Sequence, residues 1–332
     1  MAADRAEPKG QAVVWALRLR RVLPLLVTAS LLAAILFSVD FPAVFGRAAA
    51  ISLPFLGLAI AAMAANIVIS SCRFQRVLQK LLASRPRLRD ILNINLLTLF
   101  AAHFMPIAAA ADGLRVAAMR VRFKLTVGEA LEGVVHDRVL AVAGLFLCLL
   151  LSLPLQAMLS VGKMLLVPQL AFVIGFFAIV GTFAWIGSGQ MRAIPGWLIK
   201  VESLLKRLVK HVGDARCLVV QCALAIGGII AFAVMLYFLA RGMAADLPFA
   251  AAIAFAPAIY LSQVVPFFYV GFGARETVTM ALLSGSGTMG PDVAVSLSMM
   301  VGVCNLLVSL PGVLVAARYA GTMSARKREN RD

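Results

Sequence analysis

Apolar stretches long enough to cross a lipid bilayer recur from one end of this chain to the other. A spanning helix needs about 20 mostly apolar residues. We expect full spans at residues 22–41, 49–71, 132–153, 164–187, 217–240 and 293–317. Charged residues make up only 14% of the chain, too few to cover the surface of a soluble domain. The sequence therefore predicts an all-α polytopic membrane protein with six full transmembrane helices.

Basic residues set the predicted orientation. The formal net charge is +16, and 26 of the 31 Lys and Arg residues fall in five clusters between the apolar runs. The clusters lie at residues 5–21, 73–89, 115–124, 192–216 and 318–331. Basic residues in short loops hold those loops on the cytoplasmic side of a membrane. We therefore expect a bacterial-type cytoplasmic (inner) membrane protein with both termini in the cytoplasm, and the charge needs no nucleic-acid partner.

The segment 91–105 does not fit a simple crossing. As a helix its 15 residues would be about 22 Å long, whereas the hydrocarbon core is roughly 30 Å thick. A full crossing would also strand Arg115 and the basic residues that follow it on the outer side. We therefore expect a re-entrant helical hairpin that enters from the cytoplasm, turns between Pro106 and Gly113, and returns.

A second segment, 250–284, repeats the frame of the first. In "PIAAAADGLR" (106–115) and in "PFFYVGFGAR" (266–275), a glycine follows the proline by seven positions and an arginine comes two positions later. Only Arg275 and Glu276 are charged in this segment, so charge does not distinguish a hairpin from two crossings. The shared frame favours a second re-entrant hairpin. Its turn residues would be Pro266, Gly271 and Gly273.

The order of the segments predicts an inverted repeat. Each half reads as span, span, hairpin and span, and an odd number of crossings turns the second half upside down. We expect a single membrane domain, 1–332, with pseudo-repeats at about 1–155 and 156–320. Residues 192–216 fit an amphipathic helix on the inner leaflet or, alternatively, a loop helix packed on the protein. Residues 321–332 form a basic cytoplasmic tail.

Charged residues beside the predicted turns and at the start of the third span are candidate binding residues. They are Asp112, Arg115, Asp137, Arg138, Arg275 and Glu276. A charge at membrane depth costs at least about 2.5–3.5 kcal/mol, so these side chains should face the protein interior or a wet cavity. Arginine forks and helix N-terminal N–H groups suit phosphate. The alternative is that an acid and an arginine within each hairpin only pin it shut. Asp137 is either an interfacial anchor or a partner for Arg115.

No motif indicates an enzyme or a cofactor. The five cysteines and three histidines lack metal-ligand spacing, and there is no HExxH, GxSxG or P-loop sequence. We expect no disulfide, no metal and no cofactor. An enzyme acting on a lipid phosphate would need a general base, for which His103 and His136 are the candidate imidazoles.

Three blocks of this sequence resemble the pattern of a known family, the lysylphosphatidylglycerol synthase transmembrane-region family of flippase-like integral membrane proteins. The blocks are Pro106…Asp112-Gly113-Leu114-Arg115, Asp137-Arg138, and Pro266…Gly271-Phe272-Gly273-Ala274-Arg275-Glu276. The resemblance covers most of the chain. In the first block, alanines stand where the family pattern is rich in glycine.

The resemblance implies a role in moving lipids between leaflets, with aminoacylated phosphatidylglycerol as the lipid in fused synthases and other lipids or lipid-linked sugars in stand-alone members. The polar stretches here are too short for the soluble synthase domain, so we expect no synthase activity. We expect a flippase whose partners are membrane lipids with anionic headgroups, in which Arg115 and Arg275 together hold the phosphate. A membrane-embedded lipid-modifying enzyme and a non-transporting partner of a lipid-synthesis complex remain alternatives. Association with a second copy or with a lipid-synthesis enzyme stays open.

Overall fold

The computed structural model describes most of the chain, and the described residues form α-helices and no strand. These residues are 40–81, 85–104, 108–159, 166–167, 169–171, 173–175, 215–264 and 273–317. The helices named within them are α2 (Phe41–Ala49), α3 (Leu53–Leu81), α4 (Leu88–Ala102), α5 (Ala108–Phe123), α6 (Val127–Met158), α9 (Ala215–Gly242), α10 (Phe249–Val264), α11 (Ala274–Gly285) and α12 (Pro291–Ser309). The all-α prediction is confirmed.

Four helices in the described part of the chain are long and apolar enough to cross a bilayer. They are Leu53–Leu81, Val127–Met158, Arg216–Gly242 and Pro291–Ala317. They coincide with the predicted spans 49–71, 132–153, 217–240 and 293–317. The other two predicted spans, 22–41 and 164–187, lie mostly outside the described residues, as do the segment 192–216 and the tail 321–332.

The spanning helices are longer than hydropathy predicts. Helix α3 continues to Leu81, into a stretch expected to be a basic loop, because Phe74, Val77 and Leu78 are buried on one of its faces. Helix α6 runs through Pro154 to Met158, beyond the predicted end of its span at residue 153. A proline is tolerated in a membrane helix because neighbouring groups satisfy the freed carbonyl. Residues Phe41–Ala49, between the first two predicted spans, form the short helix α2.

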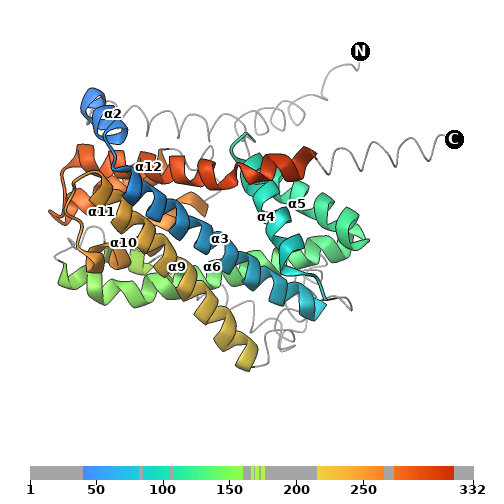
Figure 1. The fold of residues 1–332 in the computed structure, drawn as a ribbon. Coiled ribbons are helices and arrows are strands. Elements are labelled where there is room, and N and C mark those ends of the chain that lie inside the picture. Colours follow the sequence, from blue (N-terminus) through green and yellow to red (C-terminus); the bar gives the residue numbers. More distant parts are fainter. Residues whose placement is uncertain are drawn as a thin grey trace, which may run out of the picture.

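Helices α4 and α5 form an antiparallel pair, in which the start of α4 lies beside the end of α5. Arg122, in the last turn of α5, donates a hydrogen bond of 2.9 Å from Nη2 to Oδ1 of Asp90, in the first turn of α4. Gln75 of α3 donates to the carbonyl of Pro86, just before α4, at 2.9 Å. The chain therefore leaves the end of α3, turns between α4 and α5, and returns to the same end before α6 begins (Figure 1).

A second pair of short helices lies in the other half. Helix α10 has 16 residues and α11 has 12, and the two pack against each other. The predicted turn residues Pro266 and Gly271 lie between them, outside the described residues. Gly273 directly precedes α11, with φ +87°, a conformation that favours glycine.

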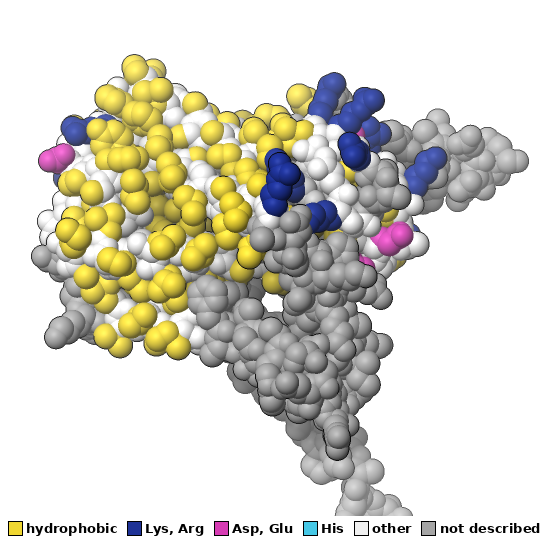
Figure 2. Space-filling view, turned by 90° about the horizontal axis from the view of Figure 1, so that it is seen from below, with side chains coloured by type: hydrophobic (Ala, Val, Ile, Leu, Met, Phe, Trp, Pro, Cys, Tyr) yellow, Lys and Arg dark blue, Asp and Glu magenta, His cyan; other side chains and the backbone are white. Residues whose placement is uncertain are grey.

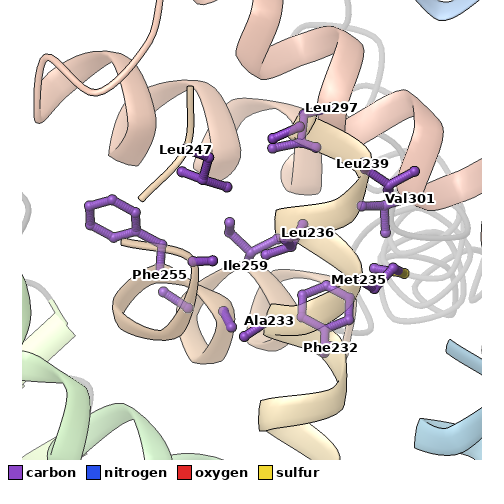
Figure 3. Close-up of a cluster of buried hydrophobic side chains, with 14 of the residues drawn as sticks. Phe232, Ala233, Met235, Leu236, Leu239, Leu247, Phe255, Ile259, Leu297 and Val301 are labelled. Carbon is purple, nitrogen blue, oxygen red and sulfur yellow. The ribbon is translucent and has the colours of Figure 1, made fainter. Parts of the chain in front are cut away.

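The main hydrophobic core lies where α9, α10 and α12 meet. Phe232 and Leu236 of α9, Phe255 and Ile259 of α10, and Leu297 of α12 point toward one another in Figure 3, and all five are buried. Helix α3 packs along α9, and Asn66 there donates a hydrogen bond of 2.6 Å to the carbonyl of Gly228. Small residues allow the two backbones to approach closely.

The surface divides into an apolar face and a basic end. Figure 2 shows a broad hydrophobic face, with most of the Lys and Arg side chains in view gathered at one end. Exposed basic residues lie at the end of α3, around the start of α4 and at the end of α5. They are Arg76, Lys80, Arg85, Arg87, Arg89, Arg120, Arg122 and Lys124. An apolar face with a basic rim at one end is typical of a protein embedded in a membrane.

The contact of α6 with α9 depends on Gly144. A Cβ added there would lie 2.5 Å from the Cβ of Ala225, whereas a Cβ at Gly128 in the same helix meets nothing within 4 Å. We expect Gly144→Ala to lower the free energy of unfolding by about 1–3 kcal/mol, because the helices must separate. Gly128→Ala should leave it unchanged or raise it, since alanine favours helix. Thermal unfolding of both variants in detergent tests this, and equal melting temperatures would contradict the close contact.

Candidate functional site

Three charged residues from three helices form what we call the core charge cluster: Arg73 of α3, Arg115 of α5 and Asp137 of α6. Arg115 and Asp137 are buried, and the Arg73 side chain is 13% exposed. The Asp137 side chain is 3% exposed. Its Oδ1 accepts a hydrogen bond of 3.1 Å from Nη2 of Arg73, and its Oδ2 accepts one of 3.0 Å from Nη1 of Arg115. One carboxylate therefore links α3, α5 and α6.

Arg115 is held on its other sides as well. Its Nη2 donates a hydrogen bond of 2.7 Å to Oδ1 of Asn95 on α4, and Nδ2 of Asn95 donates to Oγ of Ser71 at 2.8 Å. The guanidinium carbon lies 3.9 Å from the centre of the Phe74 ring, a cation–π contact. These contacts fix the orientation of a guanidinium group whose side chain is only 6% exposed.

The core charge cluster holds more positive than negative charge. Arg73 and Arg115 share the single carboxylate of Asp137, so the formal charge of the three side chains is +1. The Nε atoms of both arginines are buried and have no hydrogen-bond partner in the described part of the chain. Buried donors without an acceptor are costly, and an anion would satisfy them and balance the charge.

Asp112 and Arg138 form a second, more exposed pair beside the core charge cluster. Nε and Nη2 of Arg138 both donate to the Asp112 carboxylate, and the side chains are 48% and 28% exposed for Arg138 and Asp112 respectively. Pairing of Asp112 with Arg115 inside the first hairpin was the expected alternative, and it is wrong. Arg115 instead pairs with Asp137, the interhelix partnership that the sequence left open.

The first turn lies earlier than predicted. Gly113 is inside α5, which begins at Ala108, so its assignment to the turn is wrong. Pro106 lies outside the described residues, between Phe104 and Ala108. The alanines that precede Asp112 are the strongest helix formers, which explains why the helix begins before the glycine.

Arg275 and Glu276 form a separate buried pair at the start of α11. Nη2 of Arg275 donates to Oε1 of Glu276 at 2.6 Å, and Oγ of Ser298 on α12 donates to the same oxygen at 3.2 Å. Oε2 of Glu276 accepts the backbone N–H of Gly273 at 2.8 Å, which satisfies a free donor at the helix N-terminus. Arg275 and Glu276 therefore pair with each other, as predicted by the alternative in which an acid and an arginine pin the segment shut. Their formal charges balance.

A glycine on α12 makes room for Arg275. A Cβ at Gly302 would lie 2.9 Å from Nη2 of Arg275. The guanidinium group therefore rests against the backbone of α12, where Ser298 also accepts a hydrogen bond of 3.0 Å from its Nε.

The structure does not bring Arg115 and Arg275 together. Helix α5 packs against α4 and α6, whereas α11 packs against α10 and α12. Figure 1 places α5 and α11 at opposite ends of the molecule. The expectation that the two guanidinium groups hold one phosphate is therefore wrong, and each arginine belongs to its own cluster.

Residues 21–312 match the family described as Lysylphosphatidylglycerol synthase TM region. The chain belongs to this family. The match confirms the resemblance and, with the apolar helices, a membrane protein with a lipid-related role. No curated protein matches the sequence.

In this protein of the lysylphosphatidylglycerol synthase TM-region family, the sequence did not predict several residues of the core charge cluster and of the Arg275–Glu276 pair. Arg73 lies in the basic cluster 73–89, which the sequence assigns to a cytoplasmic loop. Asn95, Ser71 and Ser298 are polar residues within apolar helices, and polar residues there are a recognised signal of function. Gly302 gives no signal of its own, because glycine is common in membrane helices.

The two candidate histidines, His103 and His136, contact backbone carbonyls of their own helices. Nδ1 of His103 lies 2.8 Å from the carbonyl of Leu99, and Nδ1 of His136 lies 2.8 Å from that of Glu132. Within the described ranges, no three His, Cys, Asp or Glu side chains are grouped so as to hold a metal.

Removing the shared carboxylate should destabilise the fold strongly. Asp137→Asn would leave Arg73 and Arg115 buried together without an anion, so we expect a loss of about 3–5 kcal/mol in the free energy of unfolding. Asp112→Asn, which makes the same chemical change in a half-exposed pair, should cost less than about 1 kcal/mol. Chemical denaturation in detergent measures both. Similar losses for the two variants would show that the cluster does not hold the helices together.

Proposed function

We propose that this protein moves a lipid with an anionic headgroup across the cytoplasmic membrane. The observation that carries the proposal is the core charge cluster, in which the buried Arg115 and the partly buried Arg73 share one carboxylate and each keep one buried, unused Nε–H donor. A buried excess of positive charge in a membrane protein attracts an anion and marks a transport pathway in many families. Membership of a lipid-related family supports a lipid as the source of that anion.

We propose that α4 and α5 form a re-entrant hairpin. The ion pair between Arg122 and Asp90 supports this, because it joins the end of α5 to the start of α4. The length of α4, 15 residues, supports it too, because such a helix reaches only about 22 Å. We propose the same for α10 and α11, and an inverted repeat that relates the two halves, with the basic end and both termini in the cytoplasm.

The two clusters would have different roles in this proposal. Arg115 binds the headgroup, and Asp137 is its resting partner. Arg275 and Glu276 neutralise each other beside Ser298, so we assign them to holding α11 against α12. Asp112 and Arg138 lie at the exposed edge of the core charge cluster, where an arriving headgroup would meet them. In this proposal the protein is a transporter without enzyme activity, and its partners are anionic membrane lipids.

Leaflet exchange in liposomes tests the transport proposal. The purified chain should move fluorescent phosphatidylglycerol between leaflets faster than empty vesicles do, measured by dithionite quenching. Arg115→Gln should lower that rate about tenfold or more, because it removes charge-assisted hydrogen bonds to the phosphate. It leaves Arg73 and Asp137 as a balanced pair, so the protein should still fold.

Arg120→Gln is the matched control for this measurement. It removes the same charge from an exposed position of the same helix and should leave the rate unchanged. Exchange no faster than in empty vesicles for every anionic lipid class would refute the transport proposal, as would equal rates for the two variants.

Cysteine labelling tests the proposed topology. In a chain whose five native cysteines are replaced, Arg120→Cys should react with a membrane-impermeant maleimide only from the cytoplasmic side, because it follows a hairpin that returns inward. Ser286→Cys, after α11, should react only from the outside. Labelling of both positions from the same side would refute the inverted arrangement.

A further inference from the structure

Arg73 contacts Asp137 in the same way as Arg115 does. Its Nη2 donates to one oxygen of Asp137 while Arg115 donates to the other. Its Nε, like that of Arg115, is buried and without an acceptor among the described residues. Two arginines on different helices therefore converge on one carboxylate, and each keeps one unused Nε–H group.

We propose that Arg73 and Arg115 bind the headgroup phosphate jointly, with Asp137 as their shared counter-ion, and that the ligand is a singly charged phosphodiester. The lipid source of this phosphodiester rests on the proposed function. The joint site itself rests only on the contacts of the three side chains.

The charge of the core charge cluster selects the class of ligand. Two guanidinium groups and one carboxylate sum to +1, so a phosphodiester with a single negative charge makes the site neutral. A phosphomonoester carries about −1.5 to −2 at pH 7 and would leave excess negative charge in a buried place. A zwitterionic headgroup would leave the positive charge uncompensated. An uncompensated buried charge is strongly unfavourable, so neutrality favours the diester.

Exposure indicates which arginine the ligand meets first. The side chain of Arg73 is 13% exposed and that of Arg115 is 6% exposed. Within the core charge cluster, a headgroup would therefore meet Arg73 before Arg115, which Asn95 and Phe74 hold in place.

Calorimetric titration of the full-length chain in detergent tests the joint site. Dioctanoyl phosphatidylglycerol is the probe, and dioctanoyl phosphatidic acid, dioctanoyl phosphatidylcholine and soluble dimethyl phosphate are the comparators. Arg73→Gln should weaken phosphatidylglycerol binding about tenfold to a hundredfold, because it removes charge-assisted hydrogen bonds. Arg76→Gln makes the same change at an exposed position of the same helix and should alter the Kd less than about twofold.

The unaltered chain should bind phosphatidylglycerol more tightly than either phosphatidic acid or phosphatidylcholine. Equal Kd changes for Arg73→Gln and Arg76→Gln would overturn the joint site, and tighter binding of phosphatidic acid would overturn the assignment to a diester. Should Arg73→Gln fail to fold, Arg73→Lys keeps the charge and removes the planar fork. An unchanged Kd for that variant would equally overturn the site.

These outcomes separate the site from the transport proposal. If the Arg73 effect on binding is found but liposomes show no leaflet exchange, the joint site stands and transport is refuted. If dimethyl phosphate binds as tightly as the lipid, the arginine site stands and the lipid source is refuted. If exchange occurs and neither its rate nor the Kd responds to Arg73→Gln, transport stands and the joint site is refuted.

Discussion

The position of one buried carboxylate determines how the first half of this protein is assembled. Asp137 takes one guanidinium group on each oxygen, and those groups come from α3 and α5. Without this acid the two arginines would destabilise the fold, because an isolated buried charge costs several kcal/mol. The hairpin of α4 and α5 must therefore return to the end where α3 finishes and α6 begins. The ion pair between Arg122 and Asp90 holds the end of α5 beside the start of α4 there.

The two charge clusters differ in what they leave unsatisfied. Glu276 accepts hydrogen bonds from Arg275, Ser298 and the backbone of Gly273, so that cluster is neutral and its acid is fully used. The core charge cluster keeps a formal charge of +1 and two unused donors. A neutral, saturated cluster stabilises packing, whereas an unsaturated cationic one is suited to a ligand that can complete it.

Much of the fold follows from hydrophobicity, and most of the errors concern places where packing overrides it. The four described spans were predictable from apolar runs. The extension of α3 to Leu81 was not, because its basic residues suggested a loop while Phe74 and Leu78 were buried against other helices. Arg115 and Asp137 were recognised as candidates from their charge at membrane depth. Arg73 was not, since one sequence cannot show which of many basic residues turns inward.

The same spacing of proline, glycine and arginine produces two different sites because the helices begin at different points of the frame. In the first frame alanines precede Asp112, so α5 starts at Ala108 and Arg115 lies about two turns inside it. From there it reaches other helices. In the second frame Gly273, with φ +87°, holds back the start of α11, and Arg275 lies in the first turn beside Glu276. The residues that fix the start of the second helix of each pair therefore decide whether its arginine binds across helices or next to itself.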